Sequence, residues 1–437
     1  MTSTDEPPSG ADPAMTENPY GGKPGSGISL PPYFRPTPSV VNASNYFPVG
    51  EKLGPDEMRI SFVGSCPFPP RRDQAGTSMM VELGNGDRFF FDLGSGCLRN
   101  IVAMQVPFMA VNDIFISHLH VDHFADLPYL YCFAPWLLRW KPLRVHGPSG
   151  RTPKDGTKAM IEGMKQMTHW HTKSFKTSAV GDGYEVEVNE FDWQDENGLC
   201  YDRNGVQVRH WPRSHVMDGA SAYRLDWNGL SFVWTGDGRP DKLTLKYAKN
   251  VDVFVTEMQA DLGSLSESRM GIPQLIGNTT IDSAHTVPYA VGYLLKQLMP
   301  RLGMATHLEY DRGTAPEMIA GIRTHYDGWF EFGLDVTVVN VTKDAIWVRD
   351  AVLPEAANPA RPDPTQLLSP EDLHNLRSPT PTTPPPEIAF PNPEYNRDEI
   401  QQQATRDAEI DPKLYYPPDV YREQTPNFPK DFRMKLG

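Results

Sequence analysis

The sequence predicts an α/β fold, a four-layered α/β/β/α sandwich in which two sheets pack face to face under outer helices. Three observations favour this fold. The chain has 437 residues, of which 39% are hydrophobic, so it can bury a full core. Short strand-like runs dominate the stretch that begins near residue 57. Further along, they alternate with helical stretches such as residues 157–164, as expected where helices cover the faces of sheets.

The chemically distinctive residues lie in one continuous block, and we therefore expect one domain over residues 56–353. Residues 1–55 are rich in Pro and Gly and show little apolar periodicity, which predicts an extended N-terminal arm. Residues 354–437 include a proline-rich run at 378–386 and predict a C-terminal extension.

The C-terminal extension also carries aromatic residues that a solvated tail would not need, among them Tyr415, Tyr416 and Tyr421. Two interpretations stay open: an arm that packs over the domain or over a neighbouring subunit, and a disordered tail. With the first, we expect a homo-oligomer that forms through the terminal arms.

The strongest chemical signal is the run from residue 117 to residue 123. Three imidazoles and a carboxylate, those of His118, His120, His123 and Asp122, directly follow an apolar run. Histidines two residues apart do not face one side of a helix, but they converge where a strand ends and the chain turns. This HxHxDH pattern predicts the first half of a two-metal centre, against the alternative of a polar turn rich in histidine.

Three further candidate ligands stand at the edges of predicted strands. His215 lies shortly before a strand-like run, Asp237 follows one in a turn flanked by glycines, and His307 follows another. Each residue alone is as typical of an ordinary loop. Their order and spacing after HxHxDH favour a shared metal centre.

Matching segments in a fixed order connect this chain to a known family. They are residues 62–65, residues 91–96, HxHxDH, residues 147–150, His215, residues 235–237, Glu257, His285 and His307. With this pattern, residues 57–350 resemble the metallo-β-lactamase-fold hydrolases, in particular the ribonuclease Z and arylsulfatase-like branch. The resemblance implies a metallo-β-lactamase sandwich with a catalytic domain at 56–353 and extended arms on both sides.

The resemblance also implies residue roles. One metal is held by His118, His120 and His215, the second by Asp122, His123 and His307, and Asp237 bridges them. Nitrogen and oxygen donors without a thiolate suit two zinc ions first, with manganese or iron possible. Two such cations turn a bridging water into the nucleophile. Asp122 also counts among the expected catalytic residues.

A proton donor for the leaving group is expected from His285 and Glu257. In ribonuclease Z a glutamate and a histidine at similar places form a relay beside the metals, which implies that Glu257 orients His285 as the general acid. The alternative is a histidine that caps a helix and a glutamate that holds a metal ligand. For Asp92 we expect a contact with a metal ligand or a structural role, and not a catalytic one.

Aromatic side chains crowd the segment after HxHxDH: Tyr129, Tyr131, Phe133 and Trp136. Such residues line small-molecule pockets, and core packing is the alternative.

The formal net charge of −14 disfavours nucleic acid, because affinity for a polyphosphate backbone comes largely from Lys and Arg. The long Gly-rich basic arm with which ribonuclease Z grips tRNA has no counterpart in residues 151–176. We therefore expect a hydrolase of a small-molecule ester: a sulfate ester, a phosphodiester, or a lactone or carboxylic ester. The alternatives are a ribonuclease Z-like endonuclease acting on RNA and a non-catalytic metal-binding or regulatory protein.

The sequence begins without a basic stretch followed by an apolar one, and it has no run of about eighteen apolar residues. We expect a cytoplasmic protein without a membrane partner. The four cysteines are scattered and predict reduced packing residues.

Overall fold

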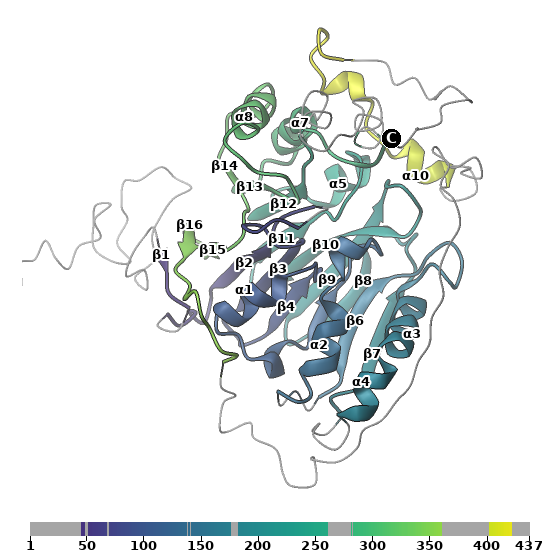
Figure 1. Cartoon of the computed structure of the whole chain (residues 1–437). Helices are drawn as coiled ribbons and strands as arrows, with labels where there is room; N and C mark the ends of the chain where they lie inside the picture. Colours follow the sequence, from purple (N-terminus) through teal and green to yellow (C-terminus); the bar gives the residue numbers. More distant parts are fainter. Residues whose placement is uncertain are drawn as a thin grey trace, which may run out of the picture.

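The computed structural model describes residues 45–48, 51–67, 70–137, 139, 141–175, 182–260, 281, 283–360 and 402–421. In these residues two β-sheets lie face to face between two layers of helices (Figure 1). The predicted four-layered sandwich is therefore confirmed.

The first sheet has the strand order β1-β16-β15-β2-β3-β4-β5-β6-β7 in the described part of the chain. Its strands are β1 (Asn45–Tyr46), β2 (Met58–Gly64), β3 (Ser78–Leu83), β4 (Arg88–Phe91), β5 (Asp113–Phe115), β6 (Leu143–Pro148), β7 (Val186–Phe191), β15 (Thr337–Val341) and β16 (Ile346–Ala351). The strands from β4 to β7 are parallel, so their carboxyl ends meet at one edge of the sheet. The HxHxDH run leaves β5 at this edge.

The second sheet has the order β14-β13-β12-β11-β10-β9-β8 over the described residues. Its strands are β8 (Gly198–Arg203), β9 (Val206–Arg213), β10 (Ala220–Trp227), β11 (Leu230–Trp234), β12 (Val253–Glu257), β13 (Leu302–Thr306) and β14 (Phe330–Phe332). The strands from β11 to β14 are parallel, and β9 points the same way because both are antiparallel to β10. The segments that carry His215, Asp237 and His307 therefore leave the sheet at one edge.

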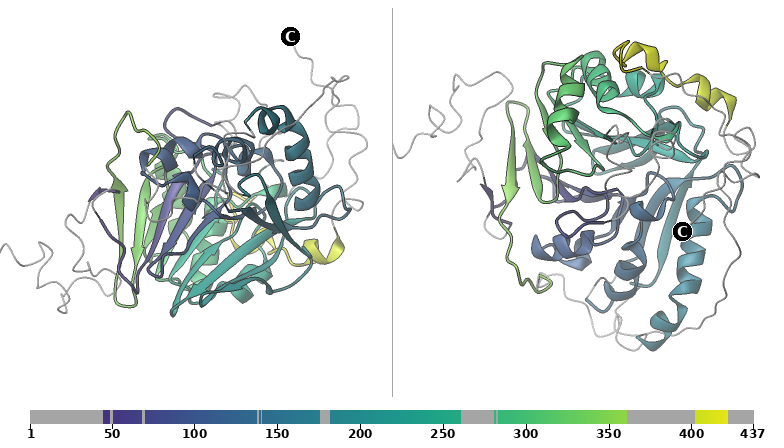
Figure 2. Two further views of the ribbon diagram at one scale, coloured as in Figure 1. Left: turned by 90° about the horizontal axis from the view of Figure 1, so that it is seen from below. Right: turned by 45° about the horizontal axis from the view of Figure 1, so that its top comes forward.

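Helices cover the outer faces of both sheets, as Figure 2 shows from two further sides. The first sheet carries α1 (Cys97–Ala103), α2 (Leu127–Phe133), α3 (Thr157–Met167) and α4 (His169–Ser174). The second sheet carries α5 (Lys242–Tyr247), α7 (Pro288–Leu298) and α8 (Ala315–Arg323), while α10 (Gln403–Asp407) belongs to the C-terminal segment.

The alternation of side chains along each strand divides the core into layers. Phe89 and Phe91 of β4 point between the two sheets, where Phe91 stacks on Phe115 with ring centroids 5.1 Å apart. Phe90, between them, packs beneath the helices of the first sheet. Successive side chains of a strand face opposite sides, so a slip of one residue would exchange the two layers. This fixes the register of the strands that lead to the site.

Parts of both predicted arms lie against the domain. Asn45 and Tyr46 form a parallel strand beside β16. In the C-terminal segment 402–421, Ile410 and Tyr415 are each only 3% exposed and belong to the same hydrophobic cluster as residues of α7 and α8. Residues 1–44, 49–50, 361–401 and 422–437 of the two arms lie outside the described residues.

The structure describes the helices and the four cysteines, for which the sequence predicted no membrane span and no disulfide. No helix in the described residues is long and apolar enough to cross a membrane. All four cysteines are buried, and none of them forms a disulfide within the described part of the chain.

Candidate metal centre

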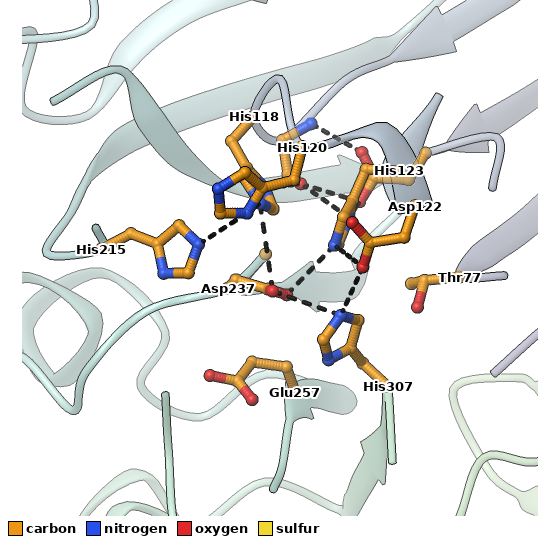
Figure 3. Close-up of polar contacts among 12 residues, drawn as sticks. Thr77, His118, His120, Asp122, His123, His215, Asp237, Glu257 and His307 are labelled. Carbon is orange, nitrogen blue, oxygen red and sulfur yellow. Dashed lines mark hydrogen bonds and ion pairs between the residues drawn. The ribbon is translucent and has the colours of Figure 1, made fainter. Parts of the chain in front are cut away.

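The HxHxDH segment ends in a single 3-10 turn, Val121–His123, of which His123 is buried. His118 and His123 are buried, whereas His120 is exposed at the mouth of the site. The Nε2 atom of His118 lies 2.9 Å from Nδ1 of His120, which lies 3.1 Å from Nε2 of His215 (Figure 3). Three ring nitrogens from two distant segments therefore converge on one point.

A second group of donors lies beside the first. The Nε2 atom of His307 is 3.2 Å from Oδ2 of Asp122, and Nε2 of His123 is 3.5 Å from the same oxygen. Asp237 borders both groups: its oxygens lie 3.4 Å from His123, 3.2 Å from His307 and 3.9 Å from His118 (Figure 3). The structure thus brings all seven predicted ligands together, in the two predicted groups.

These residues fit two divalent cations. Within each group the candidate ligand atoms lie within 4.8 Å of one another. Nε2 of His123 and Oδ1 of Asp237 are buried and have no hydrogen-bond partner among the described residues. Because a buried polar atom without a partner is costly, a cation at the common point would stabilise both. Imidazole and carboxylate donors without thiolate suit zinc and related divalent metals.

Neighbouring residues fix the orientation of the histidine rings. Nδ1 of His123 lies 2.9 Å from Asp92, whose carboxylate also accepts hydrogen bonds from Ser117 and Trp234. Nδ1 of His215 lies 2.7 Å from the carbonyl oxygen of Ala284. Partners of this kind hold a metal-binding ring in one tautomer and orientation. The expected structural role of Asp92 agrees with these contacts.

Gln259 is a functional candidate that sequence reasoning missed. Its Nε2 lies 3.0 Å from Nδ1 of His307 and donates a hydrogen bond to the His307 carbonyl oxygen over 3.0 Å. It holds His307 in a left-handed backbone conformation, with φ of 55°. A glutamine two residues after Glu257 gives no sequence signal of its own.

The electrostatics of the site favour bound positive charge. Burial lowers the pKa of His118 and of His215 well below the ordinary value, which keeps both rings neutral, the form that binds a metal. Burial acts the same way on His123, but Asp237, Asp92 and Asp122 outweigh it and raise its pKa well above the ordinary value. The carboxylates around His123 therefore stabilise a positive charge at this position, and either a bound cation or a proton can supply that charge.

His285 and Glu257 lie together beside the ligands. Nδ1 of His285 is 3.3 Å from Oε1 of Glu257, and the His285 ring lies between those of His215 and His307, with centroid distances of 5.3 and 5.9 Å. Burial lowers the pKa of His285, but the charge of Glu257 outweighs it, and the net shift is upward.

His285 is not the N-cap of α7, which begins at Pro288 and has Val287 as its N-cap. Glu257 also accepts hydrogen bonds from the backbone N–H groups of Gly238 and Thr286. It therefore both orients His285 and fixes the loop that carries Asp237. His285 also lies close enough to Asp237 and His307 to form a third group of candidate metal donors.

Comparison with known proteins identifies relatives of this chain. Residues 58–264 match the family model described as Anti-Pycsar protein Apyc1. Ribonuclease BN of Proteus mirabilis (strain HI4320) is 24% identical over 317 residues, which cover 62% of this chain and 96% of that protein. Ribonuclease Z of Archaeoglobus fulgidus is 25% identical over 291 residues, 59% of this chain and 90% of the relative. This chain is a metal-dependent hydrolase of the metallo-β-lactamase superfamily.

The ribonuclease Z-like branch that the sequence predicted is confirmed by these relatives, while the arylsulfatase-like part of the resemblance stays a prediction. Among solved structures, the metallo-β-lactamase fold protein YhfI from Bacillus subtilis matches this hydrolase with a TM-score of 0.48 and 16% sequence identity. That match covers 67% of this chain and 100% of YhfI.

The aromatic residues after HxHxDH divide between a cavity and the core of this hydrolase. Tyr129, Phe133 and Trp136 line a cavity of about 810 Å³ between α1, α2 and residues 353–359. Tyr131 is 4% exposed and packs in the core, as the alternative predicted. None of the seven ligand residues lines this cavity.

Proposed function

We propose that this hydrolase is a binuclear metal-dependent phosphodiesterase that cleaves an ester of a small organic phosphate. The observation that carries the proposal is the convergence of seven donors from separate segments into two groups that share Asp237. The bond type is supported by the relatives: both are ribonucleases by name, and RNA is joined by phosphodiesters. Sulfate esters and lactones are the other ester classes to test.

In this proposal His118, His120 and His215 hold one cation, while Asp122, His123 and His307 hold the other. We propose zinc, with manganese or iron as the other metals that such donors accept. Bound there, two divalent cations supply Lewis acidity, which activates water and stabilises charge on the reacting ester.

His285 supplies the proton for the leaving group in the proposed mechanism. The contact of its Nδ1 with Glu257 stabilises the protonated ring and leaves Nε2 as the second N–H donor. Its position between His215 and His307 places the ring beside both cation groups. Geometry of this kind is what a general acid needs.

A small substrate is favoured over RNA by the charge of the chain. A formal net charge of −14 repels a polyphosphate, and residues 151–175 form α3, α4 and the loop before them, with few glycines. The runner-up is an RNA endonuclease, which the names of the relatives support comparably.

The proposal is tested with purified protein of measured metal content. The panel contains bis(p-nitrophenyl) phosphate, a 3′,5′-cyclic nucleotide, p-nitrophenyl sulfate, a lactone and a structured RNA. We expect phosphodiester hydrolysis that a chelator abolishes and zinc or manganese restores, with His120→Ala protein as the control for contaminating activity. Protein that holds two metals and cleaves only the sulfate or the lactone would overturn the phosphodiester assignment. Metal-loaded protein that cleaves nothing would favour a binding or regulatory role.

A further inference from the structure

The C-terminal segment 402–421 lies along the helices of the second sheet, close to the metal centre. Figure 1 shows it in yellow beside α5 and α7. The backbone of Ala408 accepts a hydrogen bond from Lys242 N over 2.8 Å, and Ile410 N donates to Pro240 O over 2.9 Å. These contacts attach the segment directly to the chain that follows Asp237.

One side chain of this segment, that of Glu409, reaches between two ligand loops. Its Oε1 accepts a hydrogen bond from the hydroxyl of Ser214, the residue before His215. Its Oε2 lies 3.0 Å from Nε of Arg239, two residues after Asp237. The two loops also touch each other, since Arg239 N donates to Ser214 O over 2.7 Å. Glu409 thus ties the loop of a ligand in one group to the loop of the shared ligand.

The contact between Glu409 and Arg239 matters because both side chains are charged. The Arg239 side chain is only 6% exposed, and in the described part of the chain it forms an ion pair with one carboxylate, that of Glu409. Removing one partner of a buried ion pair leaves the other charge uncompensated, which is strongly unfavourable. Without Glu409, the Arg239 guanidinium would repel cations in the adjacent centre and shift the Asp237 loop.

We propose that Glu409 is a positioning residue for the metal centre, through which the C-terminal segment sets the affinity for the metals. This inference rests on the metal centre of the proposed function and not on the substrate. Arg213 joins the same two loops from inside the domain, where its Nη2 donates to Gly238 O over 2.9 Å. Glu409 therefore adjusts a site that is already formed.

The test compares five full-length variants: Glu409→Ala, Glu409→Gln, Ser214→Ala, the double variant Ser214→Ala with Glu409→Ala, and Asp407→Asn. Asp407→Asn is the matched control, because it removes the same charge from an exposed side chain of the same segment. Zinc affinity is measured by competition with a chromophoric chelator, and the stability of the metal-free protein is measured separately by urea unfolding. Groups that orient metal ligands are typically worth about 10- to 100-fold in metal affinity, and we expect a loss of this size for Glu409→Ala.

We expect a smaller loss for Glu409→Gln, which keeps an acceptor for Ser214, and zinc affinity close to wild type for Asp407→Asn. Ser214→Ala and Glu409→Ala should be less than additive when combined, because they remove one shared contact. Zinc affinity of Glu409→Ala within about twofold of wild type would overturn the inference, and so would an equal loss in Asp407→Asn. If Glu409→Ala does not fold, the zinc affinities of Glu409→Gln and Ser214→Ala are used instead. Values within about twofold of wild type for both variants would then overturn the inference. Zinc binding is read without a substrate, so failure of the phosphodiesterase proposal leaves this test intact.

Discussion

Asp237 is the residue that borders both groups of metal donors, and it therefore distinguishes a two-metal centre from two independent clusters. We predict that Asp237→Ala weakens the binding of both metals, whereas His120→Ala weakens the binding of one, because Asp237 borders both groups and His120 belongs to one. Elemental analysis of the purified variants measures this. For both variants, turnover should fall by more than the ~10- to 100-fold caused by changing residues that only orient ligands. Full metal content in Asp237→Ala would contradict a shared ligand.

His285 allows the proton donor to be separated from metal binding. We predict that His285→Ala keeps both metals and loses about 10²- to 10⁴-fold in turnover on phosphodiesters with poor leaving groups. The loss should be far smaller on p-nitrophenyl esters, because a good leaving group departs without a proton. Rates on a matched pair of alkyl and p-nitrophenyl diesters measure the difference. Equal loss on both, or loss of metal, would assign His285 to the ligand set instead.

Asp218 gives a prediction about pH. Burial raises the pKa of its carboxyl from an ordinary value near 3.8 to about 6, and its Oδ2 accepts a hydrogen bond from Gln402 N over 2.8 Å. Between these two values the folded protein holds a proton that the unfolded chain has lost, so this group's contribution to stability falls as pH rises through about 4 to 6.

The Asp218→Asn variant has no carboxyl group at this position and so cannot bind or release this proton. Relative to this variant, the wild-type free energy of unfolding should fall as pH rises from about 4 to about 7. Urea unfolding at several pH values, with chelator present so that metal release does not contribute, checks this. Parallel curves for the two proteins would show that Asp218 does not titrate in this range.

At the scale of elements, the candidate metal ligands lie directly after the carboxyl ends of parallel strands. The segments after β5, β11 and β13 carry HxHxDH, Asp237 and His307, and the two sheets face each other so that these ends meet. This arrangement depends on packed strands, and it places the C-terminal segment, which lies beside α5 and α7 (Figure 1), in a position to influence the site.

The packing of that segment is tested by two substitutions on it. Ile410 is 3% exposed and Leu414 is 55% exposed. We predict that Ile410→Ala lowers the free energy of unfolding by about 2 to 5 kcal/mol, as for other buried large-to-small changes. Leu414→Ala should change it by no more than about 0.5 kcal/mol. Urea unfolding of both variants measures this, and equal small effects would mean that the segment does not contribute to the folded core.

At the scale of the whole molecule, net charge separates the two proposed substrate classes. With a formal net charge of −14, we predict no measurable binding of a structured RNA at low salt, where phosphate contacts are strongest. Fluorescence anisotropy in a series of salt concentrations checks this, with a basic RNA-binding protein as the positive control. Tight binding at low salt that weakens steeply with added salt would favour the endonuclease.

Much of the site was predictable because its chemistry is concentrated in a short run. His118, His120, Asp122 and His123 lie within six positions, and no common structural role needs such a run. Glu257 and His285 came from the resemblance, and the structure places them together. Gln259 and Glu409 were not predictable, because a single glutamine or glutamate carries no pattern until a distant ligand loop lies against it.

The sequence by itself determined the two layers of strands, the ligand types and the order of the ligands, because periodicity and residue chemistry are local properties. The resemblance implied that Asp237 joins the two groups. Only the tertiary structure decided that His285 does not cap α7 and that residues 402–421 lie against the metal-binding loops. Those facts depend on which segments meet across hundreds of residues. Burial of apolar side chains drives that meeting, and no local pattern specifies the contacts that result.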